Sequence, residues 1–308
     1  MTSPSILNVI DNSFCCGCGA CSTLSDDISM KLNEYGYFEV ILDKKARNDL
    51  ELMNMASKVC PFSDESIDET EIGGLIYDDA PQKSTYIGNY INSYIGYVNE
   101  GEFRSKGSSG GIGKWIACEL FKQGEVDSVI QVKMNERYSQ TAPLYEYGVF
   151  DSYESIAEGS KSAYYPVEMS SVIAHIKNVP GKYVVTGVHC FIKAIRLLQE
   201  EDPVLKERIR YTIGVICGHL KSKCYAEMIG WQLGVKPNDL MSLDFRKKIE
   251  GSNAKEKGVE ARSINDPQFI SSDIVQNLFG TNYGEGFFKL KACDYCDDVF
   301  NETADIVV

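Results

Sequence analysis

Cysteines are the residues of this sequence whose spacing most clearly indicates chemistry. Four of them near its start have the spacing of iron–sulfur ligands: Cys15, Cys18, Cys21 and Cys60. Two-residue spacers curl the backbone so that three thiolates converge, and the intervening Gly17 and Gly19 permit the tight turns that sulfur ligation needs. The remote fourth cysteine precedes Pro61. The pattern predicts one 4Fe-4S cluster bound by these four thiolates.

Two further observations bear on that cluster. In two-cluster ferredoxins the run continues with a fourth cysteine four positions after the third, where this chain has Ser25, so one cluster is expected here. Paired cysteines also bind tetrahedral zinc, which is the alternative. Three cysteines at two-residue spacing and a Cys-Pro pair favour an iron–sulfur cluster over zinc. Cys16 falls outside the spacing and is not expected to be a ligand.

A second set of cysteines is dispersed: Cys190, Cys217, Cys293 and Cys296. The first two follow apolar, β-branched runs at 182–188 and 210–216. If these runs are parallel strands, both thiols emerge at the carboxyl edge of a sheet, where open α/β sheets bind ligands. The terminal C-x-x-C pair would complete a four-thiolate site. Buried structural cysteines are the alternative, as expected for Cys118, and Cys224 is the substitute ligand.

A glycine- and serine-rich segment, Ser108-Ser109-Gly110-Gly111, lies between a predicted strand and a predicted helix. Small residues before a helix start present unpaired backbone N–H groups to an anion, and the serines add hydroxyl donors. The segment matches neither a Walker A loop nor G-x-G-x-x-G in register. It predicts a phosphate site, with a plain flexible loop as the alternative.

Several elements must position these residues. Residues 28–43 alternate apolar and polar residues around a turn signal and predict a hairpin, residues 49–60 predict a helix, and the acidic run 63–74 predicts a linker. From about residue 90, strands at 93–99 and 126–134 alternate with helices, as do the two runs before the dispersed cysteines. The helices are expected at 111–124, 191–201 and 224–235.

This order predicts a mixed α/β or α+β fold with a small head at 1–75 and a larger α/β domain at 76–308. The charged stretch after residue 245 predicts no element. With 308 residues, 44% of them apolar, the chain can bury a sizeable core. Its net charge of −13 disfavours nucleic acid as a partner. Absence of a long apolar run or a signal peptide predicts a cytoplasmic protein without a membrane span.

Together these residues resemble the beta subunit family of coenzyme F420 hydrogenases and dehydrogenases, which are iron–sulfur flavoproteins. Six ordered motifs carry the resemblance: the Cys15–Cys21 run with Cys60-Pro61, Ser108–Gly111, Gly159-Ser160-Lys161, Thr186–Cys190, Cys217-Gly218-His219, and Cys293–Cys296 followed by Ala304-Asp305-Ile306.

The resemblance implies a ferredoxin-like head, a flavin-binding larger domain with FAD, and a second 4Fe-4S cluster on the dispersed cysteines. It implies that the Ser108–Gly111 segment, Ser160 and Lys161 bind FAD, with Lys133 as a further candidate. The implied function is an oxidoreductase that passes electrons between clusters and a two-electron donor or acceptor. The partners would be ferredoxin or a partner redox subunit, and deazaflavin coenzyme F420 or another hydride-accepting small molecule.

Two departures from the family pattern stand out. His189 replaces the proline that usually precedes the equivalent of Cys190, and the chain ends at Val308, where the family pattern continues, so the tail is expected to be truncated or dispensable. His189 and His219 flank predicted ligands and are expected to hydrogen-bond a cluster or flavin, or to be structural; His175 is expected to be an ordinary helix residue. Two other functions remain open: a non-catalytic electron-transfer subunit and a zinc-stapled binding module.

Overall fold

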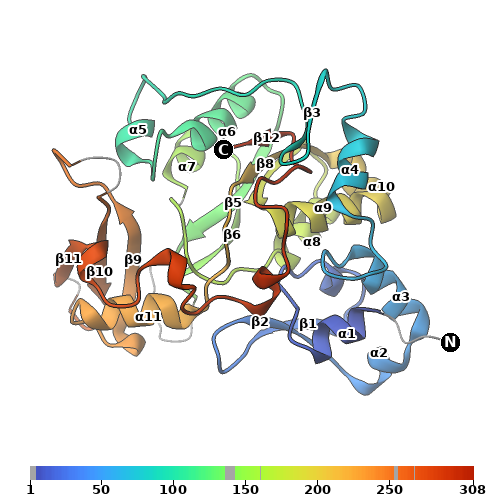
Figure 1. The fold of residues 1–308 in the computed structure, drawn as a ribbon, viewed down its shortest axis with the longest axis horizontal. Helices are drawn as coiled ribbons and strands as arrows, with labels where there is room; N and C mark the ends of the chain where they lie inside the picture. Colours follow the sequence, from blue (N-terminus) through green and yellow to red (C-terminus); the bar gives the residue numbers. More distant parts are fainter. Residues whose placement is uncertain (1–4, 136–142, 160, 253–255, 267) are drawn as a thin grey trace.

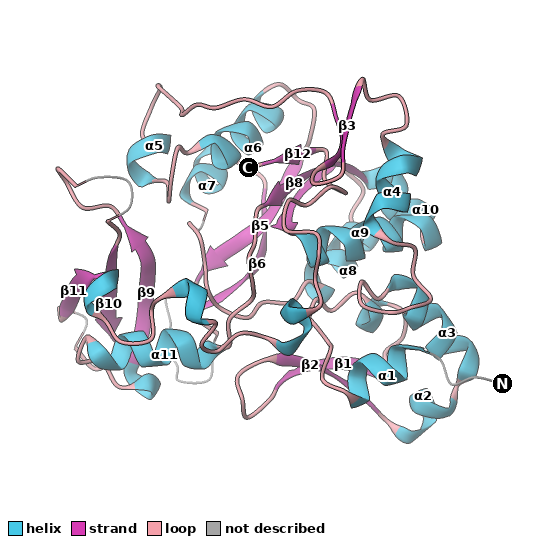
Figure 2. Cartoon of the chain, in the orientation of Figure 1, coloured by secondary structure: helices cyan, strands magenta, loops and turns pink. Residues whose placement is uncertain are grey.

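A central sheet organises the chain, with the N-terminal segment at one end and a small second sheet at the other (Figure 1). The computed structural model describes residues 5–135, 143–159, 161–252, 256–266 and 268–308. Helices lie on both sides of the central strands (Figure 2). The predicted mixed α/β fold is confirmed at this level.

The central sheet has the strand order β12-β8-β7-β5-β6. Its strands β12, β8, β7 and β5 are parallel, whereas β6 is antiparallel to β5. The bounds are β5 Ser128–Met134, β6 Tyr145–Phe150, β7 Tyr183–Val188, β8 Ile209–Val215 and β12 Ile306–Val307. The strands expected at 126–134, 182–188 and 210–216 are therefore confirmed, and the last two are parallel.

Both faces of this sheet are covered, as parallel sheets require. Val129 and Val184 pack against α6 and α7, whereas the next residues along each strand, Ile130 and Val185, pack against α8 and α9. Successive strand residues point to opposite faces, so each strand joins two cores. The covering helices are α6 Ile112–Lys122, α7 Tyr153–Glu158, α8 Ser170–Asn178, α9 His189–Glu201 and α10 Pro203–Arg208.

Residues 5–76, called the head below, combine a hairpin with short helices. Their bounds are α1 Ser5–Asp11, β1 Ile28–Leu32, β2 Phe38–Leu42, α2 Lys44–Asn48, α3 Leu50–Val59 and α4 Glu69–Ile76. The expected hairpin and the helix at 49–60 are confirmed. Met53 and Val59 of α3 share one core with Phe191 and Ile195 of α9, so the head packs directly on the α/β part.

The linker expected at 63–74 is wrong, because α4 occupies its second half. Asp68 caps this helix by accepting a hydrogen bond from the Glu71 backbone N–H, and Glu69 and Glu71 lie in its first turn. Acidic residues favour a helix N-terminus, since they satisfy free N–H groups and oppose the helix dipole. The acidic run was therefore a helix start rather than a solvated connection.

The strand expected at 93–99 is also wrong: no strand is assigned there, and Tyr94 and Ile95 are exposed. A β-prone run forms a strand only where a neighbouring strand supplies a ladder, and here the Val98 N–H donates a single bond to the Gly110 carbonyl. Short elements flank it: β3 Gln82–Ser84, β4 Gly88–Tyr90 and α5 Phe103–Lys106.

The second sheet lies where no element was expected beyond residue 245. Strands β9, β10 and β11 form an antiparallel sheet on which α11 packs. The bounds are α11 Lys223–Gln232, β9 Leu240–Lys247, β10 Gly258–Ser263 and β11 Ile270–Ile274. Charged residues of these strands form ion pairs: Glu260 of β10 pairs with Lys247 on the neighbouring strand β9 and with Arg262 on its own strand. Gly234, at φ +88°, follows the C-cap residue of α11 in the left-handed conformation that commonly ends a helix.

The last strand is attached through an ion pair that is buried on its Arg196 side. Arg196 of α9, whose side chain is 8% exposed, lies 2.9 Å from Asp305, and the Thr212 N–H donates to the same carboxylate at 2.7 Å. Replacing Asp305 by Ala leaves Arg196 buried without its carboxylate, so we expect a loss of about 3 kcal/mol in unfolding free energy. Anaerobic urea unfolding measures this. Glu200→Ala removes an exposed pair with Lys206 and should cost under about 1 kcal/mol; equal losses would contradict the prediction.

Among the described residues, no helix is both long and apolar enough to cross a membrane.

Candidate metal centre and anion-binding loop

The four head cysteines predicted as ligands lie together and are largely buried. Cys18, Cys21 and Cys60 are at most 9% exposed, and Cys15 is partly buried. Burial and then the neighbouring Cys18 raise the pKa of Cys15 to about 11. Cys21 and Cys60 also have raised pKa values, from burial and then from Cys18. The head therefore gathers four thiols that disfavour each other's ionisation.

Two glycines shape the loop that carries these thiols. Gly17 and Gly19 have φ values of +73° and +82°, which residues with a side chain rarely adopt. A Cβ atom at Gly17 would also lie 2.8 Å from the Phe38 carbonyl oxygen. The Met169 N–H donates to the Cys18 carbonyl at 2.9 Å, so the loop is held between the head hairpin and the start of α8.

Cys16 has thiol neighbours that its spacing did not predict. It is 8% exposed, and its side chain is hydrogen-bonded to Cys18 on one side and to Cys190 on the other. Cys16 therefore lies between the head thiols and the dispersed set. The contact with Cys190 spans most of the chain, so spacing within the loop carried no signal for it.

The dispersed cysteines are brought to the carboxyl edge of the central sheet. Cys190 is the second residue of α9, directly after β7, and Cys217 lies two residues beyond β8. Burial and then Cys293 and Cys296 raise the pKa of Cys217 to about 12, which places the C-terminal pair beside it. The hydrogen bond from Cys16 lowers the pKa of Cys190, but burial and Cys217 outweigh it, giving about 11.

The substitute ligand has a different environment. The thiol of Cys224 donates to the Tyr35 carbonyl at 3.6 Å, and it is not among the groups that shift the pKa of Cys217. Cys293, by contrast, accepts a hydrogen bond from the Leu220 N–H at 3.2 Å, close to Cys217 in the chain. Cys118 is fully buried in the core under α6, as expected.

Both histidines beside the dispersed thiols are held by close contacts. His189 Nε2 lies 2.8 Å from Cys296 Sγ, and the His219 ring stacks on Tyr283 with centroids 3.8 Å apart. Burial lowers the pKa of each histidine to about 4. Both rings are therefore neutral near pH 7. His175, as expected, lies on the amphipathic helix α8, where it packs against Tyr183.

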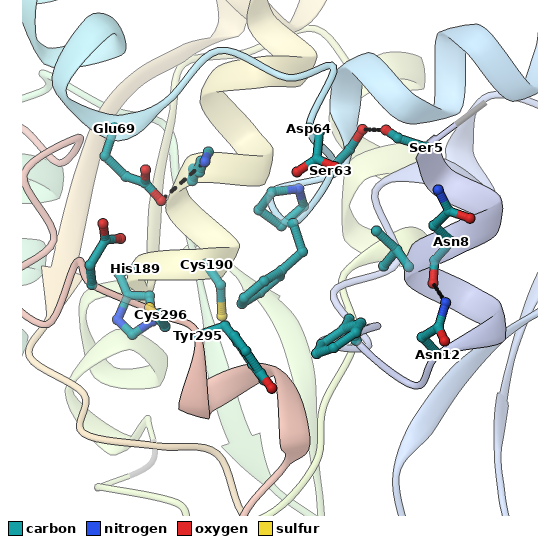
Figure 3. Close-up of a pocket in the computed structure, with 16 residues that line it drawn as sticks. Ser5, Asn8, Asn12, Ser63, Asp64, Glu69, His189, Cys190, Tyr295 and Cys296 are labelled. Atoms are coloured by element: carbon teal, nitrogen blue, oxygen red, sulfur yellow. Dashed lines mark hydrogen bonds and ion pairs between the residues drawn. The ribbon is translucent and has the colours of Figure 1, made fainter. Parts of the chain in front are cut away.

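A cavity of about 390 Å³ lies between the head and these thiols. Figure 3 shows His189, Cys190 and Cys296 grouped on one wall, with Asn8 of α1 and Asn12, the residue after that helix, opposite. The wall also holds Lys193 of α9, which is buried and paired with Glu69 of α4 at 3.1 Å. The dispersed thiols thus reach this cavity through Cys190 and Cys296, whereas the head lines it with Pro61 and Phe62, which directly follow Cys60 in the chain.

Within the described part of the chain, no group of three or more His, Cys, Asp or Glu side chains is arranged around a single ion. A 4Fe-4S cluster makes a different demand, because each of its irons takes its own thiolate.

The Ser108–Gly111 loop lies between α5 and α6, with Gly111 as the N-cap of α6 at φ +82°. A Cβ at Gly111 would collide with the Phe103 carbonyl, and one at Gly110 would lie 3.1 Å from the Gly96 carbonyl oxygen. The loop itself therefore requires a glycine at position 111 and leaves little room for a side chain at position 110. The Ser108 hydroxyl accepts a hydrogen bond from the Ser162 N–H at 2.8 Å, which ties the loop to the segment after Gly159.

Cations that the sequence analysis missed surround this loop. Lys248 donates to the Ser109 carbonyl at 3.1 Å, and Lys257 donates to the Ser108 carbonyl at 3.4 Å. Burial lowers the pKa of Lys248, and the neighbouring charges of Arg104 and Lys161 lower it further. Burial also lowers the pKa of Lys257, with a further contribution from Arg246 and Lys248. Burial likewise lowers the pKa of Lys114, helped by Lys161 and Lys106. The basic run Arg246-Lys247-Lys248, unusual in so acidic a chain, was the available signal.

The other predicted flavin residues have varied positions. Lys161 lies among these cations and pairs with Asp244 at 2.7 Å. Lys133 pairs with Glu146 on the neighbouring strand β6 at 3.0 Å. Ser160 lies outside the described residues.

Comparisons with known proteins agree in one family. The model of the N-terminal part of coenzyme F420 hydrogenase/dehydrogenase beta subunits matches residues 93–174, and the model of their C terminus matches 181–308. No curated protein matches. Among 13 matching chains of solved structures is one from the F420-reducing [NiFe] hydrogenase complex of Methanosarcina barkeri. It is 16% identical, with 73% of this chain and 72% of that chain covered and a TM-score of 0.50, a likeness of fold.

Proposed function

The chain belongs to the coenzyme F420 hydrogenase/dehydrogenase beta subunit family, and on that premise we propose that it is an iron–sulfur flavoprotein of a redox system. It would carry a 4Fe-4S cluster in a ferredoxin-like domain formed by residues 1–75. A second cluster and FAD would lie in the larger domain, residues 76–308. FAD supplies the exchange between single electrons and two-electron hydride equivalents.

The observation that carries this proposal is the pair of adjoining thiol sets. Eight cysteines that the spacing selected form two groups, and Cys16 is hydrogen-bonded to a member of each. Burial and neighbouring thiols raise the pKa values of the gathered cysteines, and the nearby cations, Lys193 at Cys60 and Lys289 at Cys293, offset this only in part. Metal binding would supply the remaining compensation and release their protons. Their chemistry therefore fits iron–sulfur ligation by Cys15, Cys18, Cys21 and Cys60 in the head and by Cys190, Cys217, Cys293 and Cys296 at the sheet edge.

The flavin part of the proposal is supported by the cations around Ser108–Gly111. A chain with a net charge of −13 has gathered lysines that lower each other's pKa, an arrangement that favours a bound anion. The adjoining N-terminus of α6 adds free N–H groups and a favourable dipole. We assign the FAD pyrophosphate to this loop, with Lys161, Lys248 and Lys257 neutralising its charge.

The proposal gives each group of residues a separate role. The thiolates hold the clusters, the lysines and the loop hold and orient FAD, and the shared core of head and sheet keeps the two thiol sets side by side. Electrons would enter or leave through ferredoxin or a partner redox subunit. Coenzyme F420 or another small molecule would exchange hydride equivalents at the flavin.

Anaerobic purification followed by iron, sulfide, zinc and flavin analysis tests the proposal as a whole. We expect about eight irons and one FAD per chain. Clusters without flavin would instead indicate an electron-transfer subunit, and zinc without iron would indicate a zinc-stapled module.

Lysine substitutions test the flavin site more sharply than glycine substitutions, because the fold of the loop itself depends on Gly111 and leaves little room beside Gly110. Lys248→Ala/Lys257→Ala removes two cations beside Ser108 and Ser109, and we expect FAD to bind at least about tenfold more weakly. Fluorescence titration of the flavin-stripped protein measures this. Lys206→Ala, on an exposed pair of α10, is the matched control. Unchanged FAD affinity in the double variant would place the flavin elsewhere.

A further inference from the structure

His189 makes one contact that bears directly on a predicted cluster ligand. It is the first residue of α9, it is 5% exposed, and its Nε2 lies 2.8 Å from Cys296 Sγ. The two residues come from distant parts of the chain and meet at the wall of the cavity in Figure 3. Within the described structure, His189 Nδ1 is buried without a hydrogen-bond partner. Cys296 is therefore the contact that orients this imidazole.

We propose that His189 donates an N–H···S hydrogen bond to the Cys296 thiolate and thereby raises the reduction potential of the second cluster. This inference rests on the proposed function, since it requires Cys296 to be a ligand of that cluster. A thiolate bound to iron has lost its proton, so only the imidazole can supply the hydrogen of this short contact. His189 is thus a positioning residue that acts through the ligand sulfur.

The direction of the effect follows from charge. One electron added to the cluster increases the negative charge on its sulfur ligands, and His189 keeps its proton throughout. A donor aimed at a ligand sulfur stabilises that added charge, so the hydrogen bond stabilises the reduced cluster more than the oxidised cluster. Removing the donor therefore lowers the potential without removing a ligand.

The position of His189 permits a clean substitution. It is the first residue of a helix, where the backbone N–H has no partner within the helix and proline is well tolerated. His189→Pro thus removes the imidazole and keeps the helix start. His189→Gln retains an N–H donor on a side chain of similar reach. His175→Gln, on the partly exposed helix α8, is the matched control for loss of an imidazole elsewhere.

The experiment is a redox titration of the anaerobically purified holoprotein, followed by electron paramagnetic resonance and accompanied by iron counts. For His189→Pro we expect full iron and a roughly tenfold fall in the reduced-to-oxidised ratio at the wild-type midpoint, which for one electron is a shift of about −59 mV. His189→Gln should stay close to wild type, and His175→Gln should not differ from it.

Three outcomes would overturn the inference. An unchanged midpoint in His189→Pro with full iron would show that the contact does not tune the cluster. Equal shifts in His189→Pro and His189→Gln would show that the donor is irrelevant. A wild-type protein with about four irons and one cluster signal would refute the second cluster itself, and the inference with it.

Discussion

Replacing Cys18 by Ala is expected to lower the iron content by about four atoms per chain and to abolish the head cluster signal. The thiol of Cys18 raises the pKa of Cys15, Cys21 and Cys60, so it lies close to all three. With one thiolate missing, one iron loses its protein ligand, and the cluster loses the binding free energy that offsets the gathered charges. Iron and sulfide analysis with electron paramagnetic resonance of the reduced protein measures the loss.

Cys16→Ala is the matched control, because it removes a thiol from the same loop. Cys16 lies outside the ligand spacing, and we expect this variant to keep its full iron content. Its hydrogen bonds to Cys18 and Cys190 make it a stringent control, since it touches a predicted ligand of each cluster. Equal iron loss in the two variants would contradict the assignment of ligands in the head.

Replacing Cys293 by Ala should remove about four irons from the second set and leave the head cluster intact. The proposed ligands of this set come from α9, from the residues after β8 and from the C-terminal segment, so ligation would also hold that segment to the sheet. Metal binding by remote segments is folding free energy as well as chemistry. We therefore expect faster proteolysis near Cys293 together with the loss of one of two cluster signals.

Cys224→Ala is the control for this second prediction. Its thiol bonds to the Tyr35 carbonyl, and we expect no loss of iron. A single cluster signal that survives both Cys293→Ala and Cys217→Ala, with about four irons throughout, would show that only the head cluster exists. Iron loss in Cys224→Ala but not in Cys217→Ala would instead show that Cys224, and not Cys217, is the ligand.

The place of the dispersed cysteines could be inferred from the sequence because strands have strong local signals. The β-branched runs at 182–188 and 210–216 indicated β7 and β8, and their parallel pairing puts Cys190 and Cys217 at one edge. The head hairpin and α3 could be predicted for the same reason, because turn residues and the alternation of apolar and polar residues are signals that span only a few positions. At 63–74 the acidic pattern is misleading because Asp68 caps a helix there. At 93–99 the β-prone pattern is misleading because no neighbouring strand pairs with it.

Spacing and backbone freedom are properties of neighbouring residues, so the sequence alone shows which cysteines share a loop and that Gly17 and Gly19 let that loop turn. Tertiary structure alone decided that Cys16 touches Cys190 and that His189 meets Cys296. It also placed Lys248 and Lys257 against the Ser108–Gly111 loop. Such partners are separated by many residues, and only the packing of helices on a sheet brings them within a few ångströms of each other.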